Sequence, residues 1–237
     1  MASFGMIMPE LPGYLDLMGA GHLLGYIIGL FTLGALLSRF FSGKIADRAG
    51  RKIVMVFGTG VTAIAGFLYV LLGAVPDYST GMLGVWLFLA LRFFHGLSTG
   101  FRPIGSSALL TDIVPHNRRG EALGFLGVAG NAGMAGGPAI GSYLAVEWGY
   151  DAMFLASSFL GILSLLFTLK LPETLPNSRK VIWSDLNVFK GKNFDIAAWP
   201  AAVTLLPVAL SFGVFLTITP DFVDDLGYKY KGVFNTI

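Results

Sequence analysis

The 237-residue sequence contains no cysteine, only three histidines and few charged residues. Without cysteine the chain cannot form a disulfide, a thiolate metal site or a cysteine nucleophile. The three histidines are scattered, unlike the closely spaced ligand sets that hold a metal ion. A Walker-type glycine loop, the usual phosphate cradle of ATP-driven proteins, is also missing. We therefore expect no enzyme, no metal site and no cofactor.

Charged side chains make up 13% of the chain, against roughly a quarter in soluble domains. Hydrophobic residues make up 54%, and the mean hydropathy is +0.71. They do not alternate as in barrel strands but form runs near or above the roughly 20 residues of a spanning helix. Uncharged runs cover 17–38, 53–76, 122–146, 152–169 and 196–220, and the run 78–101 carries one charge, Arg92. The sequence predicts an all-α integral membrane protein.

Both ends of the sequence carry shorter apolar stretches. The residues before Glu10 are uncharged but extend only about 14 Å as a helix, less than half the hydrocarbon thickness. Another apolar stretch begins at Gly232. We expect six full transmembrane helices, preceded by a truncated first helix and followed by the start of an eighth.

Lysine and arginine sort onto one side of these spans. Most of them lie in 39–52, 102–119 and 170–198, whereas the alternate connections 10–21, 74–81 and 147–151 have none. Because cationic loops stay in the cytoplasm, the pattern predicts a multi-pass protein of the inner or plasma membrane with those three loops cytoplasmic. The sequence pI near 8.8 then reflects orientation, and no nucleic-acid partner is expected.

The densest group of polar residues is the loop 43–52. Its glycines allow a tight turn, and its one carboxylate, Asp47, lies among cations. A carboxylate at a helix boundary can bind a neighbouring helix N-terminus or an arginine in one conformation and release it in another. Candidate gating residues are therefore Gly43, Asp47, Arg48, Gly50, Arg51 and Lys52. The alternative is that these cations only fix the topology.

Three stretches carry a family resemblance. Gly43-x-Ile45-x-Asp47-Arg48-x-Gly50-Arg51-Lys52 resembles the loop between helices 2 and 3 of the major facilitator superfamily. Phe88-x-x-x-Arg92-x-x-His95-Gly96 is similar to the fourth-helix motif of that family, with histidine in place of glutamine. A third stretch resembles the fifth-helix motif of its proton-coupled antiporters, with Ser142 in place of the final glycine, and contains Gly124, Gly133, Gly137, Pro138 and Gly141.

The resemblance implies an architecture and a mode of action. Residues 1–170 would form an N-terminal six-helix bundle with an incomplete first helix, 171–198 a central cytoplasmic linker, and 199–237 the start of a C-terminal bundle. The loop 43–52 would be a gate latch, and the fifth helix would lie between the two halves. The implied type is a drug or metabolite:proton antiporter that works as a monomer when full length.

Four polar residues are candidates for proton or solute binding: Arg92, His95, Glu10 and Asn131. Arg92 lies near mid-span, where a charge costs at least ~2.5 kcal/mol, so it should face protein or water. His95 follows on the same helix face and either carries a proton or is a neutral histidine with a satisfied hydrogen bond. Glu10 is either a proton or cation site or a solvated helix end. Asn131 binds either the solute or a neighbouring helix.

The run 122–146 carries a face of small residues. Gly133, Gly137 and Gly141 repeat the small-x-x-x-small pattern, so another helix can pack directly against them. Pro138 removes one backbone donor and favours a kink. This face either lets helices slide during transport or serves plain packing.

These observations predict a secondary active transporter that moves a small organic solute by alternating access. Proton-coupled export is the expected mode, and the partners are then the solute, protons and the lipid bilayer. Two alternatives stay open, namely a proton-coupled uptake symporter and a fragment that transports nothing.

Overall fold

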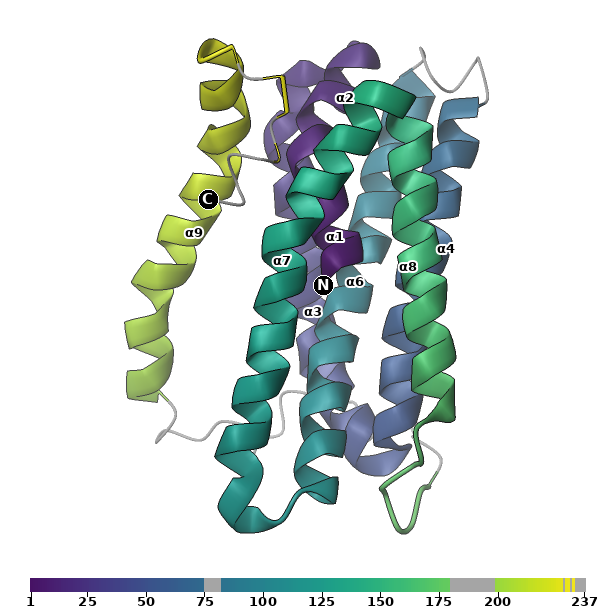
Figure 1. Cartoon of the computed structure of the whole chain (residues 1–237), viewed down its shortest axis with the longest axis vertical. Coiled ribbons are helices and arrows are strands. Elements are labelled where there is room, and N and C mark those ends of the chain that lie inside the picture. The colour runs from purple at the N-terminus through teal and green to yellow at the C-terminus, as the bar shows by residue number, and fades with distance from the viewer. Residues whose placement is uncertain (75–81, 180–198, 228, 231, 233–237) are drawn as a thin grey trace.

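The computed structural model describes residues 1–74, 82–179, 199–227, 229, 230 and 232 (Figure 1). Within these ranges the chain forms helices and no strand, so the predicted all-α bundle is confirmed. The helices are α1 (Ala2–Ile7), η1 (Met8–Glu10), α2 (Leu11–Leu17), η2 (Gly21–Leu23), α3 (Leu24–Arg48), α4 (Arg51–Ala74), α6 (Met82–Ile113), η3 (His116–Arg118), α7 (Arg119–Trp148), α8 (Tyr150–Lys170) and α9 (Trp199–Asp225).

The first helical segment consists of α1, η1 and α2 in sequence. Its tight η1 turn coincides with Pro9, which has no N–H for the α-helical ladder. Ile7, Leu11 and Leu15, spaced four apart on one face, are completely buried in the core of the bundle. Figure 1 places the N-terminus at about mid-height, with α2 reaching the upper end of the molecule.

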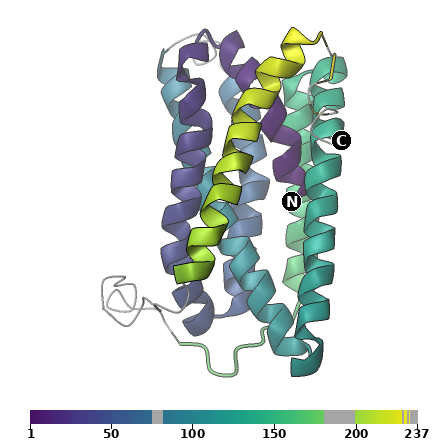
Figure 2. The same ribbon diagram turned by 90° about the vertical axis from the view of Figure 1, so that its left-hand side faces the viewer.

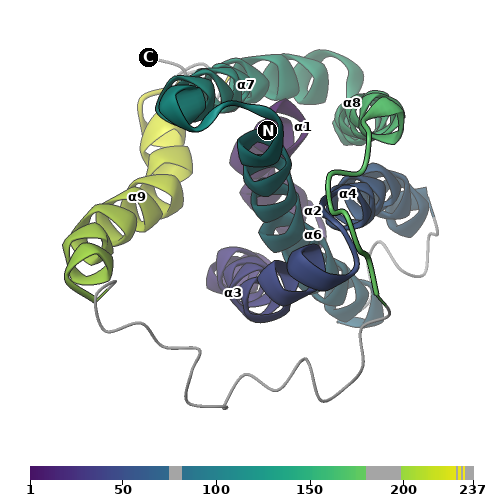
Figure 3. The same ribbon diagram turned by 90° about the horizontal axis from the view of Figure 1, so that it is seen from below.

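Consecutive long helices run antiparallel, whereas α3 and α6 lie parallel to each other (Figure 1), and the helices pack through small residues. The largest helix contacts are α3 with α6, α4 with α6 and α4 with α8, while α1 packs on α7 and α8 (Figure 3). A Cβ atom on Gly58 of α4 would lie 2.9 Å from the Ser98 carbonyl oxygen of α6. One on Gly161 of α8 would lie 2.7 Å from the Cα atom of Ala63. Glycine therefore allows this close approach, as is typical of helices packed in lipid.

In the part of the chain that the structure describes, four helices are long and apolar enough to cross a membrane, namely Gly21–Arg48, Arg51–Gly73, Leu83–Ile113 and Tyr150–Lys170. Helices α7 and α9, with 30 and 27 residues, are of comparable length. Each of the six contains most of one apolar run of the sequence.

The connections are shorter than the predicted loops 39–52 and 102–119. Helix α3 continues to Arg48 and α6 to Ile113, which leaves 49–50 and 114–118 as connections. Charged residues indicate where the apolar surface of a helix ends, whereas its backbone hydrogen bonds continue beyond that point. Pro103 lies inside α6, and its carbonyl oxygen accepts a hydrogen bond from Ser106 Oγ at 3.0 Å. Both connections and the segment 171–179 lie at the lower end in Figure 1.

Helix α9 lies on the outside of the bundle and crosses obliquely in front of the other helices in Figure 2. Its apolar side chains are largely exposed, among them Leu205, Val208 and Leu210. The predicted linker 171–198 is described only up to residue 179, and 180–198 lie outside the described residues. Of the predicted eighth helix only Gly232 is described. The division into 1–170, 171–198 and 199–237 stays a prediction.

Candidate functional site

The predicted gating loop forms the sharp corner between α3 and α4. Gly50 has φ +135°, a backbone conformation that favours glycine. The Glu173 carboxylate lies against this turn and accepts the backbone N–H groups of Arg51 at 2.9 Å and Lys52 at 3.0 Å. It thereby binds N–H groups that have no partner within the first turn of a helix, at the positive end of the α4 dipole.

Arg51 joins this corner to α6. Its Nε atom lies 3.1 Å from Asp112 Oδ2, and its Nη2 atom lies 3.4 Å from Asp47 Oδ1. Thr174 Oγ1 donates to the same Asp112 oxygen at 2.7 Å. We call Asp47, Arg51, Asp112, Glu173 and Thr174 the corner cluster.

Two further contacts tie the predicted gating residues to the chain after α8. The Lys52 Nζ atom donates to the Leu169 carbonyl oxygen at 2.8 Å. The Arg179 N–H donates to the Arg48 carbonyl oxygen at 2.8 Å. Gly43, by contrast, lies within α3, and a Cβ atom there would meet nothing within 4 Å.

The backbone donors around Glu173 lower the pKa of its carboxyl group. Partial burial alone would raise the pKa of its carboxyl group. Hydrogen bonds from the N–H groups of Leu175, Arg51, Lys52 and Thr174 stabilise the ionised form and hold that pKa below its ordinary value of 4.5. The carboxylate is therefore charged at neutral pH.

A second group of candidate residues lies buried inside the bundle. The Arg92 side chain is completely buried, with its Nη1 atom 3.4 Å from Tyr69 Oη and its Nη2 atom 3.4 Å from Met8 Sδ. Its guanidinium carbon lies 4.6 Å from the centre of the Phe31 ring, within cation–π range. None of these described contacts is a carboxylate.

His95 shares Tyr69 with Arg92. Its Nδ1 atom lies 3.3 Å from Tyr69 Oη, and the imidazole is completely buried. Within the described part of the chain, His95 Nε2 and Arg92 Nε have no hydrogen-bond partner. These two nitrogens therefore leave hydrogen-bonding positions inside the bundle that a proton, a water molecule or the solute could use. Gly96 beside it packs directly against the Phe31 backbone of α3.

The stretch Gly96-Leu-Ser98-Thr-Gly100 matches the Gly-x-Ser-x-Gly pattern of hydrolases. Ser98 nevertheless lies in the middle of α6, and its Oγ donates to the His95 carbonyl oxygen at 2.6 Å. A hydrolase nucleophile instead sits on a sharp strand-to-helix turn. In this chain the small residues of the pattern serve helix packing.

Glu10 is buried and contacts Ser142, the residue at which the sequence departs from the fifth-helix motif. Ser142 Oγ donates to Glu10 Oε1 and accepts the Gly232 N–H at 2.9 Å. The buried position does not fit a solvated helix end, one of the two readings of Glu10. A serine hydroxyl can make both contacts, and the glycine of the motif could make neither. Ser142 thus connects η1, α7 and the chain after α9.

The small-residue face of α7 receives the first helical segment. A Cβ atom on Gly133 would lie 2.8 Å from the Ala2 nitrogen, and one on Gly137 would lie 2.7 Å from the Ala2 carbonyl oxygen. Gly141 meets the Met6 backbone in the same way, whereas Gly124 meets nothing within 4 Å. Pro138 is buried, and its carbonyl group lies against Gly232.

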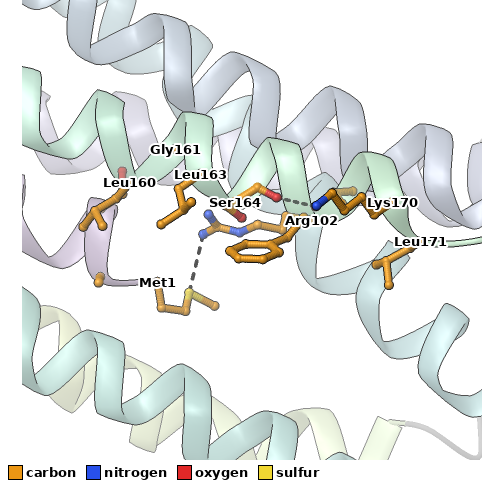
Figure 4. Close-up of a pocket in the computed structure, with 12 residues that line it drawn as sticks. Met1, Arg102, Leu160, Gly161, Leu163, Ser164, Lys170 and Leu171 are labelled. Atoms are coloured by element: carbon orange, nitrogen blue, oxygen red, sulfur yellow. Dashed lines mark hydrogen bonds between the residues drawn. The ribbon is translucent and has the colours of Figure 1, made fainter.

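A residue that the sequence reasoning assigned to a loop lines the cavities of the bundle. Arg102 of α6 lines three overlapping cavities of about 560, 510 and 520 Å³, and Met1 lines all of them as well. Figure 4 shows the Arg102 guanidinium between Met1 and residues of α8. Asn131 of α7 lines two of these cavities. A lone arginine directly before a proline at the end of an apolar run was the available signal.

The candidate residues therefore occupy separate places. The gating residues gather at the helix corner, Arg92 and His95 share a buried cluster, and Glu10 contacts α7. Asn131 lines a cavity away from these contacts.

Comparison with known proteins places the whole chain in one family. The model of the Major Facilitator Superfamily matches residues 1–237. Multidrug resistance protein MdtG of Klebsiella pneumoniae (strain 342) is 30% identical over 241 residues, which cover 98% of this chain and 56% of MdtG. Quinolone resistance protein NorA of Staphylococcus aureus is 26% identical over 213 residues, which cover 89% of this chain and 51% of NorA.

A solved structure shares the fold. The crystal structure of a D-xylose-proton symporter matches with a TM-score of 0.67 at 17% identity, covering 99% of this chain and 63% of the symporter chain. This chain spans about half the length of the curated relatives it matches.

Proposed function

Because this chain belongs to the Major Facilitator Superfamily, a family of multi-pass membrane transporters and not of enzymes, we propose that it serves proton-coupled export of a small organic solute. The relatives MdtG and NorA are named for drug resistance, which supports export over uptake. Solute and protons would cross by alternating access of an N-terminal bundle, residues 1–170, against a C-terminal bundle that begins at 199.

The observation that best supports proton coupling is the buried cluster of Arg92, Tyr69 and His95. An intramembrane cation without a carboxylate contact is costly and is retained where it serves a function. His95 lies beside it, and one of its ring nitrogens is unpaired among the described residues and is therefore available to exchange a proton. Glu10, buried against Ser142, is a second candidate carrier.

A flux experiment tests this function. The chain, together with the sequence that flanks it in its gene, is reconstituted in liposomes. Their lumen is acidic and contains a pH-sensitive dye. Addition of a quinolone should raise the lumen pH, because solute enters as protons leave. A fall in lumen pH would indicate uptake symport in place of antiport, and no change with any member of a solute panel would indicate a chain that transports nothing.

The role of His95 is tested in the same liposomes. His95→Gln restores the residue of the family motif and keeps a hydrogen-bonding side chain. If His95 carries a coupling proton, the pH profile of flux should change while solute binding is retained. An unchanged profile would remove His95 from coupling.

We propose the corner cluster as the gate. Asp47 is largely exposed, and its ion pair among the described residues is a 3.4 Å contact with Arg51, so it can exchange that partner for another helix in a second conformation. Asp47→Asn should slow flux several-fold without loss of folded protein. Equal flux rates for the variant and the parent would contradict a gating role.

A further inference from the structure

The cavities around Arg102 have a one-sided charge. Three cationic residues line them, namely Arg102 of α6, Arg39 of α3 and Lys170 at the end of α8. No aspartate or glutamate lines any of the three cavities that the structure describes. A cavity lined by one sign of charge attracts ions of the opposite sign, because its low-dielectric walls focus the field.

Arg102 is the cation best placed to bind a ligand. Its side chain is half-buried and lines all three cavities, whereas Arg39 and Lys170 each line one and are exposed. Its hydrogen bond among the described residues goes to Met1 Sδ at 3.5 Å, a weak acceptor. No salt bridge of the described residues includes Arg102.

A half-buried guanidinium without a carboxylate has unused donors in a fork geometry. That geometry matches the two oxygens of a carboxylate or phosphonate, and such charge-assisted pairs are roughly twice as strong as neutral hydrogen bonds. Asn131 lines two of the same cavities and adds an amide donor. The apolar lining, which includes Phe31, Leu126 and Met134, suits the hydrocarbon part of an organic ion.

We propose that this cavity binds the anionic group of the transported solute and that Arg102 is its binding residue. The solute class is then an organic anion with a carboxylate or phosphonate group. This inference rests on the proposed transport function and adds a substrate class to it.

Equilibrium binding tests the inference separately from flux. The purified protein, with the sequence that flanks the chain in its gene, is titrated in a calorimeter with benzoate, phenylphosphonate, neutral benzamide and cationic benzylammonium. Benzoate or phenylphosphonate should bind more tightly than benzamide, and benzylammonium should bind least. The tighter of the two anions identifies the preferred group.

Two variants assign the preference to Arg102. Arg102→Gln should weaken anion binding by at least about tenfold and leave benzamide binding unchanged, because only the charge-assisted pair is lost. Arg102→Lys should retain part of the preference. The matched control is Arg118→Gln, which removes an exposed cation paired with Glu121 outside the cavities and should change nothing.

The outcomes separate the two proposals. Failure of both anions to bind more tightly than benzamide, or an anion preference that survives in Arg102→Gln, would overturn the role of Arg102. If flux still follows the proton gradient in that case, the proposed function stands alone. Anion binding through Arg102 in a protein that moves no solute would uphold the site and overturn the transport function.

Discussion

At the residue scale, the most informative pair is Arg51 and Glu173. The sequence predicted Arg51 as a gating residue from its place in a motif. It did not predict the partners Asp112 and Glu173, because an exposed acid at a helix end or in a connection has no local pattern that reveals a distant contact. Only the packing of α4 between α6 and α8 brings these residues together.

Glu173 supports a prediction about pH. Since its pKa in the folded protein lies below 4.5, its contact with α4 stabilises the fold above about pH 4.5 and is lost as the pH falls through the lower folded value. Glu173→Gln should therefore lower the free energy of unfolding at pH 7 by less than about 1 kcal/mol, which would lower the Tm slightly. The difference from the parent should shrink as the pH falls below 4.5, and a difference that stays constant as the pH falls would show that charge is not the cause.

At the element scale, α7 shows which parts of a helix the sequence can predict. The small-x-x-x-small pattern predicted a face for close packing, and the structure packs α1 on Gly133, Gly137 and Gly141. The pattern did not identify the packing partner, and the resemblance implied that this partner would be the other half of the molecule. Contact with the chain after α9 is made instead through Pro138 and Ser142.

Two adjacent glycines of α7 provide a matched test. Gly137→Ala should destabilise the protein by about 1–3 kcal/mol, because the new methyl group would lie 2.7 Å from the Ala2 carbonyl oxygen, where backbone cannot move away. Gly136→Ala meets nothing within 4 Å and should be neutral or slightly stabilising. Thermal unfolding in detergent measures both, and equal Tm values would contradict the close contact of α1 with α7.

Helix ends were the least predictable elements. Charged residues at 102 and beyond suggested a loop, but α6 extends to Ile113. Side-chain charge indicates where the lipid-facing surface ends, but it does not interrupt the backbone hydrogen bonds of the helix. The same error concealed Arg102, because a loop cation and a cavity cation look alike in sequence.

At the scale of the whole molecule, the sequence predicted the class, the family and the order of the helices. It predicted the class and the order of the helices because the length and polarity of each run are set by the thickness of the bilayer, independently of the packing partners. It predicted the family because three stretches resemble motifs of that family. The orientation of the bundle stays a prediction from the sorting of the cations.

The absence of cysteine makes this orientation directly measurable. Asn117 and Trp148 are both exposed and flank opposite ends of α7. In intact cells, an impermeant thiol reagent should label Trp148→Cys, and it should label Asn117→Cys only after permeabilisation. The reverse labelling pattern would place the cationic connections outside the cell.

The Ala49–Gly50 corner has a consequence for hydrogen exchange. The first backbone amides of an exposed helix have no partner within the helix and normally exchange with solvent within moments. At the start of α4, those of Arg51 and Lys52 instead donate to one carboxylate. Deuterium uptake there should be slow at a surface position, and its rate would report how often Glu173, in the segment after α8, releases α4.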